Sequence, residues 1–200
     1  IPQLAQNGLK LVRHYEDLTP KQAKYVDKYF EKDVYPVLTP MAVDSSRPFP
    51  LVRNKSLNIG ALIYDKKKDV TDIATVQVPS VLPRIVKLPS EEKDVTEIIL
   101  LEEVIEKNLD KLFLSYDIVC AYPYRIMINA DFSIDEEETA DLLKEIEKQL
   151  KQRQWGEVIR LEVDEAMDKK LLKELKNHLG VDDEVVYKIN GPLDLTFLMK

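Results

Sequence analysis

The fold is decided by the stretch Leu57-Asn58-Ile59-Gly60-Ala61-Leu62-Ile63-Tyr64, then Asp65-Lys66-Lys67-Lys68-Asp69, and then Asp72-Ile73-Ala74-Thr75-Val76-Gln77-Val78. Its two apolar runs are rich in β-branched residues and are separated by a charged turn, which is typical of a β-hairpin. We therefore predict strands over 57–64 and 72–78, joined by a turn at 65–69. Such a sheet needs helices packed on it to bury its apolar surface.

Three further strands and one helix are predicted directly downstream of the hairpin. A short strand over 82–88 is bracketed by prolines, which confine it to the edge of a sheet. A strand over 95–100 leads into a helix over 102–113, and the longest strand candidate follows at 117–129. Side chains alternate between the two faces of a strand. One face of this strand therefore carries Tyr122, Tyr124, Ile126 and Ile128, and Arg125 lies on the opposite face.

Capping signals predict three longer helices. Thr19-Pro20 begins one that ends before Pro36, because Thr caps free amides and Pro fits the first helical turn. The acidic run 135–138 begins a second helix that continues through Leu150. Asp168 begins a third, which stops at Gly180.

The remaining pattern completes an α+β chain with a mixed sheet and packed helices. Strands are expected over 158–163, with Ile159, Leu161 and Val163 on one face, and over 185–189. Between the first helix and the hairpin, residues 35–50 contain four prolines, which predicts an extended, stiff connection.

Composition bounds the class of protein. The 200 residues carry 29 Lys and Arg against 36 Asp and Glu, a net charge of −7, which disfavours duplex DNA and nucleic acid generally as a partner. One cysteine excludes an internal disulfide and a Cys-rich zinc site, and five glycines exclude a glycine-rich phosphate loop. No apolar run is long enough to span a bilayer, and no secretory leader is visible. The start at Ile1 and the apolar end suggest a piece of a longer protein.

Side chains able to do chemistry are few and scattered. His14 and His178 have no partner motif, and His178 in the last turn of a helix complements the helix dipole. Cys120 lies within an apolar strand and is expected to be a buried small hydrophobe rather than a nucleophile. We predict no catalytic residue and no metal site in this chain.

One basic cluster differs from the ordinary charged surface. Arg47, Arg53 and Lys55 project from the proline-stiffened region, where little conformational entropy is lost on binding an anion. The alternative, a purely surface role, stays open. By contrast, the lysines at 66–68 mark a hairpin tip without flanking aromatic residues.

The chain resembles the head (middle) domain of the bacterial polyphosphate kinases, the enzymes that synthesise long-chain polyphosphate. Two motifs are the most specific, Tyr35-Pro36-Val37-Leu38-Thr39-Pro40 and Gly191-Pro192-Leu193-Asp194-Leu195. The resembling segments cover nearly the whole chain and are residues 29–44, 47–50, 54–58, 81–84, 88–89, 101–105, 124–125, 129–131, 158–163 and 191–195.

The resemblance implies that residues 1–200 are a head domain without the N-terminal helical domain and the two C-terminal catalytic domains. It implies a fold similar to the phosphohistidine phosphatases, dimer contacts, and a role in walling the active-site tunnel. The parent enzyme reversibly transfers the terminal phosphate of ATP to polyphosphate, and its ATP, Mg²⁺ and phosphorylated histidine belong to the other domains. We therefore expect no cofactor in this fragment, other domains of the same polypeptide as partners, a homo-oligomeric parent, and a cytoplasmic location or one peripheral to the inner membrane.

Polyphosphate contact is an open expectation, with Arg47, Arg53 and Lys55 as the first candidates and Arg125 as the fourth. A polyanion needs cations spaced along its path. Family members often carry a basic residue where this chain has Ile128, which leaves Arg125 as the cation of its strand. Two alternatives remain: a stand-alone interaction domain, and a phosphohistidine phosphatase-like enzyme that uses His14 or His178.

Overall fold

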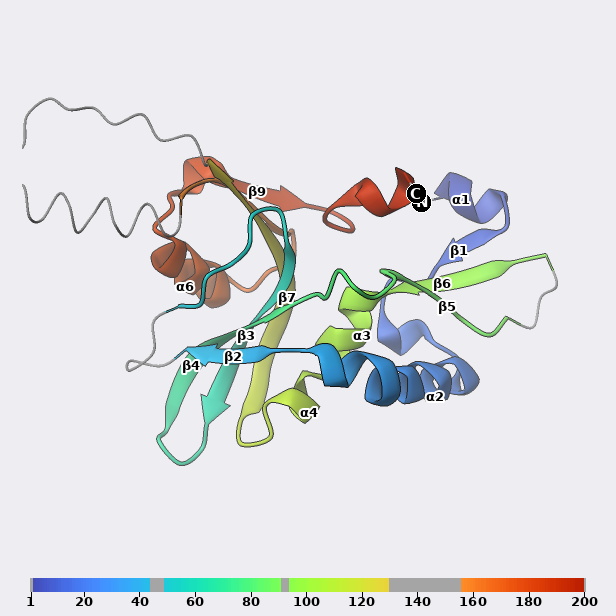
Figure 1. Ribbon diagram of the computed structural model, residues 1–200, viewed down its shortest axis with the longest axis horizontal. Coiled ribbons are helices and arrows are strands. Elements are labelled where there is room, and N and C mark those ends of the chain that lie inside the picture. Colours follow the sequence, from blue (N-terminus) through green and yellow to red (C-terminus); the bar gives the residue numbers. More distant parts are fainter. Residues whose placement is uncertain (1, 44–48, 91–93, 130–155, 200) are drawn as a thin grey trace, which may run out of the picture.

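A computed structural model describes residues 2–43, 49–90, 94–129 and 156–199. It shows an α+β fold with two sheets, both of mixed direction, and helices packed against them (Figure 1). The predicted helix over 135–150 lies outside the described residues.

The larger sheet has six strands in the order β2-β4-β3-β7-β8-β9. All neighbours are antiparallel except β8 and β9, which run parallel. The hairpin prediction is confirmed, because β3 pairs with β4 from Asn58 to Asp65. The strands are β2 (Pro40–Val43), β3 (Leu57–Asp65), β4 (Val70–Gln77), β7 (Asp117–Asn129), β8 (Glu157–Asp164) and β9 (Val186–Ile189).

The smaller sheet has the order β1-β6-β5. Its strands are β1 (Leu9–Leu11), β5 (Ile85–Lys87) and β6 (Thr96–Leu100). The edge position of β5 was expected from its flanking prolines, whereas β1, three residues long, carries no sequence signal that could have predicted it.

Two helices begin where the sequence places their caps, at Thr19 and at Asp168. The side chain of Thr19 accepts a hydrogen bond from the amide of Gln22, and α2 runs over Pro20–Tyr29. The chain does not stop before Pro36 but continues through a π-helical turn (Phe30–Val34) into a 3₁₀ turn (Tyr35–Val37), where the proline occupies an early position that needs no amide hydrogen. The remaining helices are α1 (Pro2–Gln6), α3 (Leu101–Lys107), α4 (Leu109–Leu112) and α6 (Lys169–Leu179).

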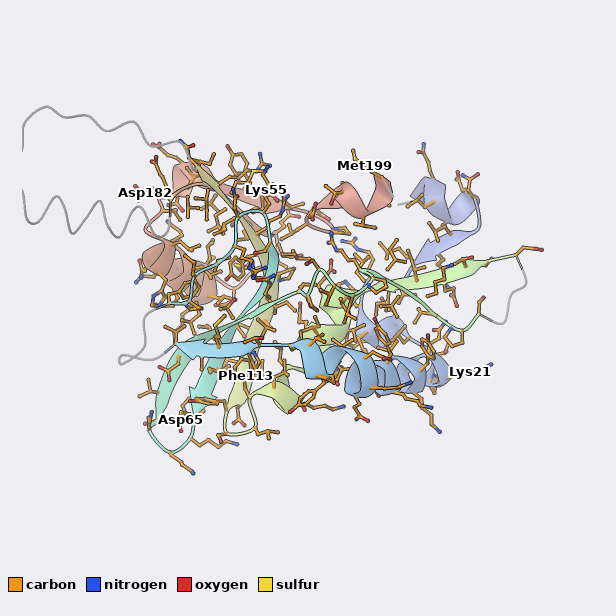
Figure 2. The ribbon with its side chains drawn as sticks, viewed as in Figure 1. Lys21, Lys55, Asp65, Phe113, Asp182 and Met199 are labelled. Atoms are coloured by element: carbon orange, nitrogen blue, oxygen red, sulfur yellow. The ribbon has the colours of Figure 1, made fainter. Side chains whose placement is uncertain are left out.

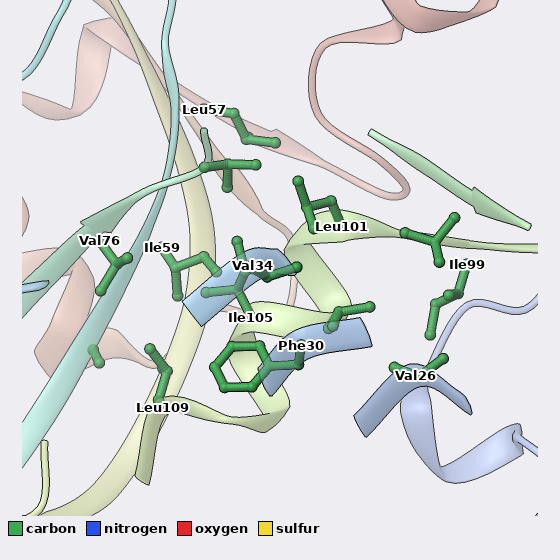
Figure 3. Close-up of a cluster of buried hydrophobic side chains, with 14 of the residues drawn as sticks. Val26, Phe30, Val34, Leu57, Ile59, Val76, Ile99, Leu101, Ile105 and Leu109 are labelled. Carbon is green, nitrogen blue, oxygen red and sulfur yellow. The ribbon is translucent and has the colours of Figure 1, made fainter. Parts of the chain in front are cut away.

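Each face of the larger sheet carries its own apolar core. On one face α2, α3 and α4 lie against β3, and Phe30, Ile105 and Ile59 from three elements meet there (Figures 1 and 3). On the other face α6 packs Leu171 and Leu175 against the sheet. Gly60 on β3 allows close packing on this face, because a Cβ at this position would lie only 3.3 Å from the Tyr124 ring.

A bulge interrupts the expected alternation on β8. The predicted face of β7 is confirmed, since Tyr124 and Ile126 are buried and Tyr122 and Ile128 pack beside them. On β8 the prediction for Ile159 is wrong: the register shifts opposite Met127 and Ile128, so Ile159 is 49% exposed and Val158 packs in its place. A bulge adds one residue to a strand and reverses its inward and outward positions.

Candidate functional site

A cavity of about 690 Å³ lies between three segments: the loop before β3, the segment from the end of β4 to β5, and the C-terminal 3₁₀ segment η5 (Leu195–Met199). Lys55 on the loop and Met199 at the end of η5 lie along the same side of the molecule (Figure 2). The loop contributes residues 53–57, the second segment residues 77–85, and the C-terminal segment Asp194, Thr196 and Phe197.

The loop that carries Arg53 and Lys55 is held rigidly against β7. Asn54 exchanges two hydrogen bonds with the backbone of Ile128, donating to its carbonyl at 3.2 Å and accepting from its amide at 3.0 Å. The amide of Lys55 donates to the carbonyl of Ile126 at 2.9 Å. Lys55 itself has a left-handed backbone (φ +63), so the loop turns sharply and both side chains stay exposed.

Arg53 and Lys55 keep their charge available. Within the described residues neither side chain forms an ion pair or a hydrogen bond. Because they lie two residues apart on a fixed loop, they could bind an anion without first breaking an internal pair. The structure thus brings together two of the four predicted site residues, while Arg47 lies outside the described residues.

Arg84 is a third cation in the lining of the cavity, but it is already paired with a carboxylate of the protein. Its guanidinium binds the Glu102 carboxylate through Nε and Nη2, with the Nε contacts at 3.1 and 3.2 Å, and it donates to the carbonyls of Leu193 and Asp194. The two side chains are only 14% and 4% exposed. Arg84 also lies 4.7 Å from the ring centroid of Phe197, so this arginine fixes the segment that enters η5.

Arg125 lies directly behind the loop. Its Nε donates to the carbonyl of Lys55 at 3.1 Å, and its other nitrogens lie 3.2 Å from Glu162 and 3.8 Å from Asp194. With 12% of its side chain exposed, Arg125 supports the backbone of Lys55. Its direct contact with an anion stays a prediction.

Asp194 joins the two arginines. Burial raises the pKa of its carboxyl, but hydrogen bonds from Thr196 and the nearby Arg125 and Arg84 outweigh this effect and hold the pKa below its usual value. The carboxylate therefore stays ionised and offsets part of the two guanidinium charges. Sequence reasoning did not assign Arg84, Asp194 or Phe197 to a site, because Arg84 meets the other two from more than a hundred residues away in the sequence.

His14 lies in a different environment, a cavity of about 290 Å³ whose ten lining residues include four acids and one lysine. Its Nδ1 is 3.7 Å from Glu103. Burial, reinforced by neighbouring carboxylates, raises the pKa of Glu103 to about 7 and that of Glu106 to about 8. Glu16 and Asp110 line the same cavity, so its charge opposes a phosphate ligand.

The other reactive side chains have apolar surroundings. His178 stacks on Phe49 with ring centroids 5.1 Å apart and borders a small cavity with Ile126 and Ile128. Cys120 is half-buried, and burial raises the pKa of its thiol. Within the described ranges no group of three or more His, Cys, Asp or Glu side chains is arranged to hold a metal ion. Among those residues no helix is both long and apolar enough to cross a membrane.

Comparison with known proteins decides the family. The family described as the polyphosphate kinase middle domain matches residues 21–200. The chain belongs to this family. The resemblance drawn from the proline-rich segment and the Gly-Pro-Leu-Asp-Leu motif is confirmed.

Relatives and a solved structure agree with this assignment. The chain is 47% identical to a polyphosphate kinase of Halalkalibacterium halodurans over 202 residues and 46% identical to one of Lactiplantibacillus plantarum, in both cases over its full length. It spans 28% and 27% of these two relatives. A crystal structure of polyphosphate kinase from Porphyromonas gingivalis matches 98% of the chain with a TM-score of 0.77 at 22% identity, covering 28% of that protein, which confirms the α+β fold.

Proposed function

We propose that the chain is the non-catalytic head domain of a polyphosphate kinase, which supports dimerisation and shapes the tunnel in which the parent enzyme reversibly transfers the terminal phosphate of ATP to polyphosphate. One observation carries the proposal: the whole chain matches a segment that makes up 28% of the length of a relative named polyphosphate kinase. A middle segment of this size leaves the nucleotide, the Mg²⁺ and the phosphorylated group to other parts of the same polypeptide.

The exposed cations of the 53–56 loop support a contact with polyphosphate at the tunnel wall. Within the described residues the side chains of Arg53 and Lys55 are free of internal partners, and Arg125 holds the backbone carbonyl of Lys55. A polyanion would release counterions on binding such cations, so the contact should weaken as salt rises. Since the whole domain carries a net charge of −7, most of the attraction must come from the rest of the enzyme.

The histidines give less support to a phosphatase-like activity. A histidine that accepts a phosphoryl group needs cationic or amide donors around it to stabilise the phosphate. His14 faces Glu103 in a cavity with three other carboxylates, and His178 lies on the ring of Phe49.

The test is a transfer assay with the purified 200-residue chain, ATP, Mg²⁺ and long-chain polyphosphate. We expect a folded protein without turnover in either direction, whereas turnover above a heat-treated control would contradict the proposal. Sedimentation equilibrium on the same sample tests the second element, self-association. A monomer at all concentrations would remove dimerisation from the role of this domain taken alone.

A further inference from the structure

The first half of β7 has a strand neighbour on one side only. β3 pairs with β7 from Asp117 to Arg125, whereas β8 pairs with it only from Tyr124 to Asn129. Among the described residues, therefore, no strand lies along the other side of residues 117–123. Such an unpaired edge offers backbone donors and acceptors to an added strand.

The backbone of Ala121 points out from this free edge. The carbonyl of Ile126 accepts from the amide of Lys55, so it faces the β3 side of β7. Backbone groups of successive residues point to opposite sides of a strand, and Ala121 lies an odd number of positions before Ile126, so its amide and carbonyl point away from β3. Pro123 has no amide hydrogen, so an added strand would pair with the residues that precede it.

Two adjoining cavities follow the free edge on the face of the sheet where α3 and α4 lie (Figure 1). The cavity of about 290 Å³ is lined by Ile118 and Ala121 of β7, and a smaller one of about 40 Å³ is lined by Pro123. His14 and Glu103 line both cavities, which shows that the two are neighbours. Together they form a groove beside the strand, the edge groove, which narrows towards Pro123.

The edge groove carries an excess of negative charge. The carboxylates in its lining are Glu16, Glu102, Glu103, Glu106, Asp110 and Asp164. The basic side chains in its lining are Arg13, His14 and Lys107. Glu16 is paired with Lys107, and Glu102 is paired with Arg84. The other four carboxylates therefore share only the other two basic side chains of the lining, so a cationic ligand is favoured.

Glu103 and Glu106 are the central members of this set. They lie three positions apart on α3, so they occupy the same face of the helix. Burial, reinforced by neighbouring carboxylates, raises the pKa of Glu103 to about 7 and that of Glu106 to about 8. Such shifts are expected where partly buried carboxylates face too few cations.

The other face of the same edge is apolar. Cys120 and Tyr122 are partly buried against the core that α6 covers. The side chains of an added strand would alternate between the two faces. Basic residues at every second position would therefore meet the carboxylates of the edge groove, and apolar residues between them would meet Cys120 and Tyr122.

We propose that the free edge of β7 binds an extended segment of a partner protein, which pairs with the backbone around Ala121 and places Lys or Arg at every second position in the edge groove. This surface goes beyond the proposed function, because it requires no phosphate transfer and its charge repels polyphosphate. The partner is recognised by its alternation of basic and apolar residues.

The test is a fluorescence anisotropy titration of the purified chain with the labelled peptide Thr-Lys-Val-Lys-Val-Lys-Val-Thr, blocked at both ends. The reference peptide Thr-Lys-Lys-Lys-Val-Val-Val-Thr has the same composition and charge without the alternation. We expect the alternating peptide to bind roughly tenfold more tightly, because it alone can place all three lysines on one face. Equal affinities, or no binding of either peptide, would overturn the proposal.

N-methylated peptides test the backbone pairing. One carries N-methyl groups on the three lysines and the other on the three valines, so each has one edge blocked and its side chains unchanged. We expect one of them to lose roughly tenfold or more in affinity and the other to bind as before, because only one edge of an added strand faces β7. Unchanged binding of both would contradict strand addition.

Variants of the chain test the charge. Glu103→Gln with Glu106→Gln keeps the shape of both side chains and should weaken the alternating peptide by roughly tenfold. Asp182→Asn with Glu184→Gln removes the same charge from exposed positions outside both cavities and is the matched control. An equal loss in the two double variants would indicate a general charge effect and would contradict the site.

Hydrogen exchange locates the contact. With saturating alternating peptide the amide of Ala121 should exchange roughly tenfold more slowly, and that of Lys67 at the hairpin tip should not change. Unchanged exchange at Ala121 would overturn the proposal. So would slow exchange at Ala121 in a self-associated chain without peptide, which would assign the edge to a second copy. The transfer assay tests the proposed function separately.

Discussion

Glu102 and Glu103 are neighbours on α3, yet they belong to two regions of opposite character. Glu102 pairs with Arg84 at the rigid base of the basic cavity, and it is almost completely buried. Glu103 faces His14 and Glu106 in the acidic cavity, where burial and nearby carboxylates raise its pKa to about 7. Of these two successive residues, Glu102 is therefore part of a complete ion pair, whereas Glu103 is part of an acidic cluster with too few cations to balance it.

The two regions differ in how completely their charged side chains are paired. In the basic cavity the buried charges are paired, and the two exposed cations are left for a ligand. The acidic cavity is lined by four carboxylates, of which Glu103 and Glu106 are half-buried, and by one lysine, Lys107, which is paired with Glu16. The first region is suited to binding anions, whereas the second makes the stability of the domain depend on pH.

The largest effect is expected from breaking the buried pair in the basic region. Arg84→Met should lower the free energy of unfolding by about 3–5 kcal/mol, because it leaves the Glu102 carboxylate buried without its partner. The double variant Arg84→Met with Glu102→Leu should recover part of this loss, and urea unfolding at pH 7 measures both. If the single and double variants were equally destabilised, Arg84 would act mainly through the Leu193 and Asp194 carbonyls instead.

A smaller effect is expected from pH in the acidic region. The folded-state pKa values of Glu103 and Glu106, about 7 and about 8, lie above the ordinary value of 4.5, so the fold favours their protonated forms. The stability from this preference is present below about pH 4.5 and is lost as pH rises through 7 to 8. Besides burial, the charges of Glu102, Asp164 and Glu16 raise the pKa of Glu103, whereas that of Arg13 lowers it.

Glu106→Gln tests this prediction, because it removes the titrating group and keeps the shape. At pH 8.5 the variant should be more stable than the wild type by roughly 1–3 kcal/mol, and at pH 4.5 the two should be similar. Urea unfolding across this pH range gives the comparison, with the exposed Glu184→Gln as the control. Parallel pH profiles for Glu106→Gln and the wild type would contradict the assignment.

The smallest effect is expected from His14→Ala. The imidazole is 66% exposed and lies 3.7 Å from Glu103, and surface pairs of this kind contribute roughly 0–1 kcal/mol. We expect a change in unfolding free energy below about 0.5 kcal/mol at pH 7. A change above about 2 kcal/mol would show that His14 has a structural role that its exposure does not explain.

Local signals predicted most of the fold because they depend on neighbouring residues alone. The caps at Thr19 and Asp168, the stop at Gly180 and the 65–69 hairpin turn all follow from the chemistry of one or two turns. The bulge that exposes Ile159 could not be predicted in this way, since it arises from the register between two strands.

The candidate site was predicted only in part, for the same reason. Arg53 and Lys55 stand out as cations on a stiffened segment, but Arg84 meets Asp194 across 110 residues of sequence. Similarly, the apolar residues around Val81 look like an ordinary loop until the fold places them beside Phe197. Contacts of this range depend on the packed structure and leave no local pattern.

The most direct test of the account is an amide NMR titration of the purified chain with tripolyphosphate. We predict that the shifted resonances fall in residues 53–56, 80–82, 84 and 194–197 around the basic cavity, and that those of His14, Glu103 and Glu106 do not move. Shifts centred on His14, or spread evenly over the exposed lysines, would contradict the claim that this domain separates an anion-binding cavity from an acidic one.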